Sequence, residues 1–368
     1  MFKDATLRQT VHLSVGGGRF RFQLSNAFGG SDLPITAASL AFPADGKAGA
    51  NTIDSSHIIG LSFNGSTSTT IPKGQVVYTD AVDFPVPAQS VITVTLYLQA
   101  GQTGNSITGH PGSRTTSWMQ GGNHVNASAV TGASTVHWYF LSAVEAWADE
   151  PTSALVILGD SITDGRGSTD NANNRWPDLV LEKMQKSGVT NIASDNQAAG
   201  GNTVLSGGLG PPLMQRYKRD LLQTAGVKYA IIFEGVNDIG GGSADSSTQS
   251  RIGDQLISSF QQIASDAHKA GIIVFGATIT PFGGNGQSYS NPTREATRQR
   301  VNNWILGGGN GSFDAAIDFA KVLADPGNPA NLASQYDSGD HLHPNPKGYQ
   351  AIADAFPLTI FNSNSTLH

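Results

Sequence analysis

One short segment, residues 154–167, limits what this chain can fold into more than any other. It contains the uninterrupted apolar run Leu155–Leu158, which is typical of a strand buried on both faces of a parallel sheet. Gly159, Asp160 and Ser161 follow directly, where the strand must end and the chain must turn. We therefore expect Ser161 at the carboxyl edge of a parallel sheet, where open α/β folds place their chemistry.

The sequence after residue 145 alternates apolar runs with amphipathic segments. Val227–Phe233 and Ile272–Thr278 have the composition of further buried strands. Between residues 250 and 270 apolar side chains recur at steps of three and four, which predicts an amphipathic helix. Alternating strands and helices indicate a parallel sheet covered on both faces. We expect an α/β domain over residues 146–368.

The first 145 residues have a different pattern. Arg19–Leu24 and Val91–Leu98 alternate between two faces, as half-buried strands do. Glycine-rich turn segments separate these runs, and helical periodicity is almost absent. The pattern predicts a separate all-β domain over residues 1–145, either a β-sandwich or a jelly roll.

Composition excludes several classes of partner. The chain of 368 residues has a net charge of −6 and no basic block, so we expect no nucleic-acid partner. No apolar stretch approaches the roughly 20 residues of a membrane span. Cysteine is absent and no His-Glu-x-x-His occurs, so we expect no metal. The glycine-rich segments have neither a dinucleotide nor a P-loop spacing, and we expect no other cofactor.

The composition also bears on location. Few residues are charged and Gly, Ser, Thr and Asn are abundant, which favours a secreted protein. The first residues contain no basic-then-apolar signal segment, as expected if a leader has been removed.

Polar segments in the second half supply the groups that acyl transfer needs. These groups are a nucleophile, a base, a residue that holds the base, and donors for the oxyanion. Ser161 is the candidate nucleophile, His343 the candidate base and Asp340 the candidate holder of the imidazole. The backbone N–H groups of Ser161 and Gly201 and the side-chain amide of Asn237 are candidate oxyanion donors.

Each of these assignments has a plainer alternative. Ser161 also fits the cap of a following helix, and the Gly201 and Asn237 segments also fit ordinary turns. Gly200 precedes Gly201, which leaves open which of the two N–H groups donates. His341 is a rival base that we interpret as structural. Trp176 is a candidate for the wall of a substrate pocket, with burial in the core as the alternative.

Taken together and in order, four segments resemble the blocks of the SGNH, or GDSL, hydrolase superfamily, which centre on Ser, Gly, Asn and His. The matching positions are Ser161, Gly201, Asn237 and the pair Asp340/His343, and the resemblance covers about residues 154–361. It implies a flavodoxin-like three-layer α/β/α sandwich and metal-independent ester hydrolysis through an acyl-enzyme. No serine lies in Gly-x-Ser-x-Gly, which argues against an α/β-hydrolase.

The resemblance leaves the substrate open. We expect a secreted serine esterase that removes small acyl groups, foremost acetyl, from carbohydrate, so the partner is a small-molecule or polysaccharide ester. A β-sandwich before such a domain looks like some carbohydrate esterases, which is an analogy of fold. The alternatives are a lipase or lysophospholipase with the same machinery, and a catalytically inactive glycan-binding protein. The oligomeric state stays open.

Overall fold

The structure, a computed structural model, describes residues 1–362 and divides the chain into two compact units. The first comprises Met1–Glu150 together with Asp170–Asn173. The second comprises Pro151–Thr169 and the chain from Asn174 onward.

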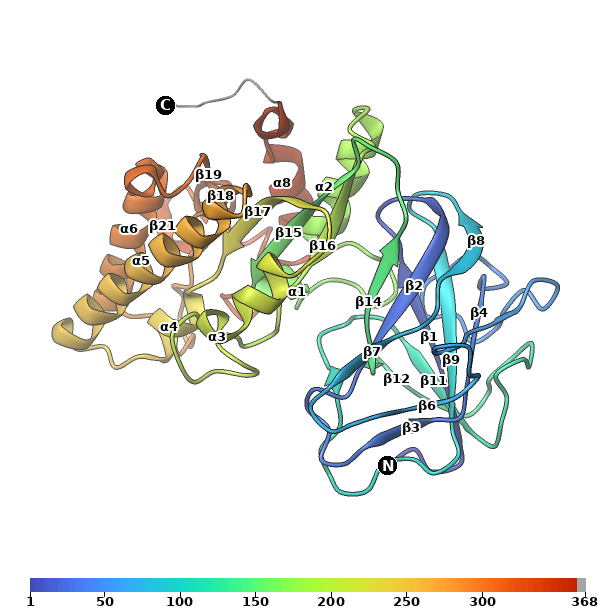
Figure 1. Ribbon diagram of the computed structural model, residues 1–368. Helices are drawn as coiled ribbons and strands as arrows, with labels where there is room; N and C mark the ends of the chain where they lie inside the picture. The colour runs from blue at the N-terminus through green and yellow to red at the C-terminus, as the bar shows by residue number, and fades with distance from the viewer. Residues whose placement is uncertain (363–368) are drawn as a thin grey trace. The chain divides into compact units, whose positions relative to one another are not determined.

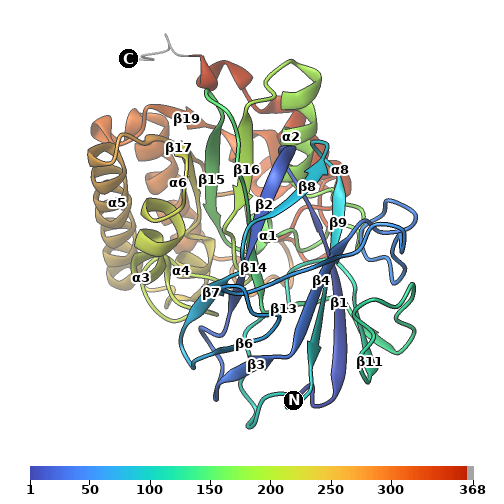
Figure 2. The same ribbon diagram turned by 45° about the vertical axis from the view of Figure 1, so that its right-hand side comes forward.

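The first unit is an all-β sandwich of antiparallel strands (Figures 1 and 2). Its larger sheet has the strand order β12-β11-β1-β9-β4-β5, and the smaller has the order β14-β2-β7 with β8 also paired to β2. The expected domain boundary between residues 145 and 146 lies within β14, which pairs with β2 up to Ala146. The strands are β1 (Ala5–His12), β2 (Gly17–Ser25), β3 (Leu33–Ile35), β4 (Ala37–Ala41), β5 (Ile59–Gly60), β6 (Thr69–Ile71), β7 (Val76–Tyr78), β8 (Val82–Val86), β9 (Val91–Leu98), β10 (Gly109–His110), β11 (Ser117–Gly121), β12 (Ala133–Thr135), β13 (Trp138–Tyr139) and β14 (Leu141–Ala146).

The expected alternation fills the core of this sandwich. Phe20, Phe22 and Leu24 of β2 point inward and are fully buried, together with the apolar face of β9. The opposite face of β9 is buried too, because loops cover it. Arg8 lies beneath these loops and donates hydrogen bonds to the carbonyl oxygens of Asn51 at 2.9 Å and Ala127 at 2.7 Å.

The second unit is a three-layer α/β/α sandwich, which confirms the expected fold class. Its parallel sheet has the strand order β16-β15-β17-β18-β19. Helices α2 and α8 pack together on one face, and α5 and α6 pack together on the other (Figures 1 and 2). The sheet strands are β15 (Ser153–Gly159), β16 (Ile192–Asn196), β17 (Val227–Phe233), β18 (Ile273–Ala277) and β19 (Ala315–Ile317), and β20 (Ala324–Asp325) pairs with β21 (Asn328–Leu332) outside this sheet. The helices and helical turns are α1 (Ser161–Asp164), α2 (Trp176–Lys186), α3 (Leu213–Tyr217), η1 (Lys218–Leu222), α4 (Val236–Gly241), α5 (Ser246–Lys269), α6 (Pro292–Leu306), η2 (Gly308–Gly311), α7 (Phe319–Leu323), α8 (Pro346–Ala355) and η3 (Leu358–Phe361).

Strand β15 is the centre of this architecture. Its residues Leu155–Leu158 are buried, as the apolar run predicts. The chain order of the strands reverses at β15, which lies between β16 and β17. Reversal points of this kind are where open α/β sheets bind their ligands, at the carboxyl ends of the strands. Within residues 1–362, no helix combines the length and apolarity that a bilayer crossing requires.

Candidate active site

Ser161 lies where β15 ends and the short helix α1 begins. The carboxylate of Asp160 caps α1 by accepting a hydrogen bond from the N–H of Ile162 at 3.0 Å, so the capping role does not fall to Ser161. Gly159 allows the sharp turn because a Cβ there would lie 2.6 Å from Oγ1 of Thr163. The local fold therefore leaves the hydroxyl of Ser161 available for another partner.

That partner is His343. The Oγ atom of Ser161 lies 2.7 Å from Nε2 of His343, and Nδ1 of the same imidazole lies 2.6 Å from Oδ2 of Asp340. Ser161 is 8 % exposed and His343 is 5 % exposed, so both groups are largely shielded from water. The structure thus joins the predicted nucleophile, base and acid in one chain of hydrogen bonds, within the distances that proton transfer requires.

Asp340 is held by its own turn. Its Oδ1 atom accepts hydrogen bonds from the backbone N–H groups of Leu342 at 3.0 Å and His343 at 2.8 Å. Burial raises the pKa of Asp340, but the hydrogen bonds from His343 and Leu342 outweigh burial and bring the pKa below its ordinary value. Asp340 is therefore ionised at neutral pH and accepts the Nδ1–H of the imidazole.

His341 belongs to a separate pair. Its Nδ1 atom lies 2.6 Å from Oδ2 of Asp337, and its backbone N–H donates to Oδ1 of Asp337 at 3.0 Å. The ring packs against Gly284, where a Cβ would lie 2.6 Å from Cγ of His341. These contacts support the interpretation of His341 as a structural residue.

The glycine pair after β16 separates into two roles. The N–H of Gly200 donates to Oδ2 of Asp164 at 2.9 Å. Among residues 1–362, neither the N–H of Ser161 nor that of Gly201 has an acceptor. Gly201 has a left-handed φ of 73°, and a Cβ there would lie 2.9 Å from Cδ1 of Leu209. Of the two glycines, Gly201 therefore keeps its donor available.

The amide of Asn237 is oriented from both ends. Its Nδ2 atom donates to the carbonyl oxygen of Asn202 at 2.7 Å, and its Oδ1 atom accepts from the hydroxyl of Tyr289 at 3.0 Å. A side-chain amide has two N–H hydrogens, so one remains for a further acceptor. The neighbouring Asp238 is structural, because its carboxylate accepts hydrogen bonds from the N–H groups of Val204 and Leu205.

A buried arginine that the sequence analysis missed connects these segments. Arg216 is 4 % exposed and donates to the carbonyl oxygen of Gly159 at 3.2 Å and to Oδ1 of Asn202 at 2.9 Å. It also pairs with Asp220 at 3.1 Å and with Glu234 at 3.3 Å. An arginine on an amphipathic helix gives no sequence signal for such a role, since it normally lies on the solvated face.

Buried carboxyl groups lie near Arg216 or near one another in this part of the site. Burial raises the pKa of Asp160 to about 7, that of Glu234 to about 8 and that of Asp238 to about 6. Hydrogen bonds to Asp160 and Asp238, and the charge of Arg216 near Glu234, oppose the effect of burial without cancelling it. Within residues 1–362, no group of three or more His, Cys, Asp or Glu side chains is arranged to hold a metal ion.

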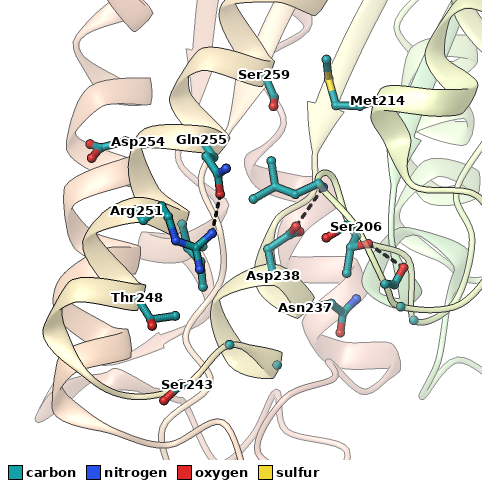
Figure 3. A pocket seen from close by; sticks show the side chains of 18 of the residues that line it. Ser206, Met214, Asn237, Asp238, Ser243, Thr248, Arg251, Asp254, Gln255 and Ser259 are labelled. Carbon is teal, nitrogen blue, oxygen red and sulfur yellow. Dashed lines mark hydrogen bonds between the residues drawn. The ribbon is translucent and has the colours of Figure 1, made fainter.

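A pocket of about 1210 Å³ opens beside the candidate oxyanion donors (Figure 3). Gly201 and Asn237 line it, whereas Ser161 and His343 do not. Figure 3 shows Arg251 and Gln255 of α5 on the side of the pocket opposite Asn237. Glycines and uncharged polar side chains make up much of the lining, among them Thr203, Ser206, Gly207, Gly208, Ser243, Thr248 and Ser258.

Trp176 does not line this pocket, and the prediction of a substrate-binding role for it is wrong. The side chain is 0 % exposed and packs among the rings of Phe233, Phe319 and Phe356. Its indole Nε1–H donates to Oγ1 of Thr163 at 3.2 Å, which satisfies its polar atom inside the core. Trp176 therefore stabilises α1 through its hydrogen bond to Thr163 and has a structural role in the core.

The second unit is similar to known proteins in sequence and in structure. A sequence model described as the GDSL-like lipase/acylhydrolase family matches residues 157–351. None of the curated proteins matches the chain. A GDSL-like lipase from Bacteroides thetaiotaomicron, of known structure, is 15 % identical with a TM-score of 0.41, and the similarity covers 56 % of this chain and 87 % of that one. An acetylxylan esterase from Geobacillus stearothermophilus is 22 % identical with a TM-score of 0.41, over 57 % of this chain and 94 % of its own.

Proposed function

Because the chain belongs to the GDSL-like lipase/acylhydrolase family and is a carboxylic ester hydrolase, we propose that it works through Ser161 and a covalent acyl-enzyme. The observation that carries this proposal is the continuous hydrogen-bond chain from Ser161 through His343 to Asp340. A serine hydroxyl is a weak nucleophile unless a base removes its proton during attack. The 2.7 Å contact between Oγ of Ser161 and Nε2 of His343 supports His343 as that base.

The reaction has two half-reactions. His343 Nε2 takes the proton of Ser161 Oγ as this oxygen attacks the ester carbon, and Asp340 stabilises the resulting imidazolium through Nδ1–H. His343 then gives the proton to the leaving alcohol, and the acyl group stays on Ser161. In the second half-reaction His343 takes a proton from water, the hydroxide attacks the acyl carbon, and Ser161 leaves with the proton. The carboxylic acid product is released.

Negative charge develops on the former carbonyl oxygen in both half-reactions. We assign its stabilisation to the N–H groups of Ser161 and Gly201 and to the remaining Nδ2 hydrogen of Asn237. A metal-independent reaction is part of this proposal, because the assigned nucleophile, base and oxyanion donors are all protein groups. Protonation of Asp160 and Glu234 near neutral pH reduces the negative charge that would oppose the oxyanion.

For the substrate we propose a short acyl group, foremost acetyl, on a polar alcohol such as a carbohydrate. Support comes from the pocket beside Gly201 and Asn237, whose lining of glycines and hydrogen-bonding side chains suits a hydroxylated ligand. A lipase or lysophospholipase is the second candidate, and the apolar members Leu205, Leu209 and Met214 of the same pocket favour it. The inactive glycan-binding alternative has no support, since the chain is an ester hydrolase.

Two measurements test these proposals. The first measures the hydrolysis of nitrophenyl acetate, butyrate and octanoate, and then the hydrolysis of acetylated polysaccharides and of phospholipids, to test the substrate class. A fall in kcat/KM from acetyl to octanoyl supports the first candidate, and a rise supports the lipase. Labelling with an organophosphonate tests the nucleophile: the label must appear on Ser161 and must be lost in Ser161→Ala. Secretion stays a prediction, and recovery of the protein from the culture medium of its native cells tests it.

A further inference from the structure

Tyr289 lies at the candidate oxyanion site although no sequence motif marks it. Its hydroxyl donates to Oδ1 of Asn237 at 3.0 Å, while Nδ2 of Asn237 donates to the carbonyl oxygen of Asn202 at 2.7 Å. If the amide were flipped, its oxygen would face the Asn202 carbonyl oxygen, and two acceptors would be in contact. The hydrogen bond to the carbonyl oxygen of Asn202 therefore selects one orientation of the amide, and the hydroxyl of Tyr289 holds the amide oxygen in that orientation.

We propose that Tyr289 is a positioning residue for ester hydrolysis, whose hydroxyl holds the Asn237 amide with its remaining Nδ2 hydrogen directed at the oxyanion. This inference rests on the proposed function, because it takes Asn237 as an oxyanion donor. A donor contributes most when its orientation is fixed before the charge develops, since no reorganisation is then needed during the reaction. In this proposal the hydroxyl of Tyr289 fixes the orientation of the Asn237 amide before the substrate binds.

Helix α4 is shaped to receive the tyrosine ring. Gly240 lies three residues after Asn237, so the two share one face of α4. A Cβ on Gly240 would lie 2.0 Å from Cδ2 of Tyr289, so the ring occupies the place of a side chain at position 240. The ring also makes an edge contact with Phe282, with centroids 6.3 Å apart. The ring is thereby fixed along α4, and its hydroxyl reaches Asn237.

The segment that carries Tyr289 also contacts the turn of the candidate acid. Gln287 accepts a hydrogen bond from the N–H of Tyr289 at 3.1 Å through Oε1 and donates one to the carbonyl oxygen of Asp340 at 2.5 Å through Nε2. One short segment therefore ties the oxyanion side of the site to the acid–base side.

The hydroxyl of Tyr289 keeps its proton at neutral pH. Burial raises the pKa of Tyr289 above its ordinary value of 10.0, and the charge of Asp160 acts in the same direction. The hydroxyl therefore stays a donor at neutral and moderately alkaline pH.

The test is a double-mutant cycle with nitrophenyl acetate as the substrate. Tyr289→Phe keeps the ring on Gly240 and removes only the hydroxyl, so we expect kcat to fall about tenfold with KM within about twofold, the loss of roughly one neutral hydrogen bond. Asn237→Ala removes the donor itself and is expected to lower kcat by about 10²–10³. In the Asn237→Ala background, Tyr289→Phe is expected to have no further effect, because its target is gone.

Two further variants separate positioning from general damage. Gly240→Ala displaces the ring and is expected to lower kcat about as much as Tyr289→Phe. Tyr229→Phe is the matched control, since the hydroxyl of Tyr229 donates to the carbonyl oxygen of Phe361 at the amino end of β17, away from the site. It is expected to leave kcat unchanged, and thermal melting of each variant verifies the fold.

The inference is overturned if Tyr289→Phe is fully active, or if it still lowers kcat in the Asn237→Ala background. It is also overturned if Asn237→Ala retains full activity while Ser161→Ala has none, an outcome that leaves the proposed nucleophile intact. Retained activity in Ser161→Ala would instead refute the proposed function itself.

Discussion

Glu234→Gln tests the electrostatics beneath the candidate site. Glu234 follows β17 directly, is 2 % exposed, and pairs through Oε2 with Arg216 at 3.3 Å. Its other oxygen, Oε1, is buried and has no hydrogen-bond partner among the described residues. An ionised carboxylate in this position loses solvation that one shared arginine does not restore. Glutamine keeps the shape and the hydrogen bond from Arg216 but cannot ionise.

The expected magnitude follows from the pKa. Burial raises the pKa of Glu234 from an ordinary value of 4.5 to about 8, against the opposing charge of Arg216. The folded protein thus holds a proton that the unfolded chain releases, so the free energy of unfolding falls as the pH rises from about 4.5 to about 8. At about 1.4 kcal/mol per pKa unit, the loss from this group is roughly 5 kcal/mol at most and is complete above the folded-state pKa.

The assay is urea denaturation of the wild type and Glu234→Gln at pH 5 and at pH 9. At pH 5 the carboxyl is protonated in the folded state and we expect the two proteins to differ by less than about 1 kcal/mol. At pH 9 the variant is expected to be more stable by several kcal/mol, up to roughly 5 kcal/mol. Glu182→Gln, at the exposed ion pair of Glu182 with Lys186 on α2, is the control and is expected to shift stability by at most about 0.5 kcal/mol at either pH.

One outcome would refute this reasoning. If Glu234→Gln destabilised the protein equally at pH 5 and pH 9, the carboxyl would be ionised at both values. Arg216 would then outweigh burial, contrary to the direction of the pKa.

The remaining predictions concern the catalytic groups and the core. Ser161→Ala and His343→Ala are each expected to lower kcat by at least about 10³ with an unchanged circular dichroism spectrum, and Asp340→Asn is expected to cost less than either, in steady-state assays. Gly201→Ala is expected to lower kcat by about 10² and to cost about 1–2 kcal/mol in urea denaturation, because its φ is left-handed; full activity would remove Gly201 from the oxyanion site. Trp176→Phe is expected to lower the unfolding free energy by about 1–3 kcal/mol with KM unchanged, whereas a raised KM would restore its substrate role.

Local sequence signals were sufficient for the parts of the site that depend on strand ends. The run Leu155–Leu158 predicted β15 because only a strand covered on both faces is apolar throughout, and a strand end must then follow at Gly159. The spacing of Asp340 and His343 also predicted a contact, because the two residues lie close together in the sequence. A side chain three residues earlier reaches the imidazole within one turn, so no distant part of the chain is involved.

Long-range contacts explain what the sequence did not reveal. Trp176 follows the Ser161 segment closely in sequence, yet α2 turns its indole into an aromatic core built from β17, α7 and the end of α8. Arg216 and Tyr289 contact Asn202 and Asn237, but they are 14 and 52 residues away from these partners. No periodicity or short motif encodes pairings at such separations.

The turn that carries Asp340 and His343 has a mechanical consequence. One carboxylate oxygen of Asp340 accepts hydrogen bonds from the N–H groups of Leu342 and His343, and the other pairs with the imidazole of His343. The acid and the base are therefore held together by their own turn. A displacement of this turn would lengthen the contact with Ser161 and the hydrogen bond from Gln287 to the carbonyl oxygen of Asp340, while the imidazole stays paired with Asp340 through Nδ1. The pairing of acid and base is therefore set within one turn of the chain and does not depend on the position of Ser161.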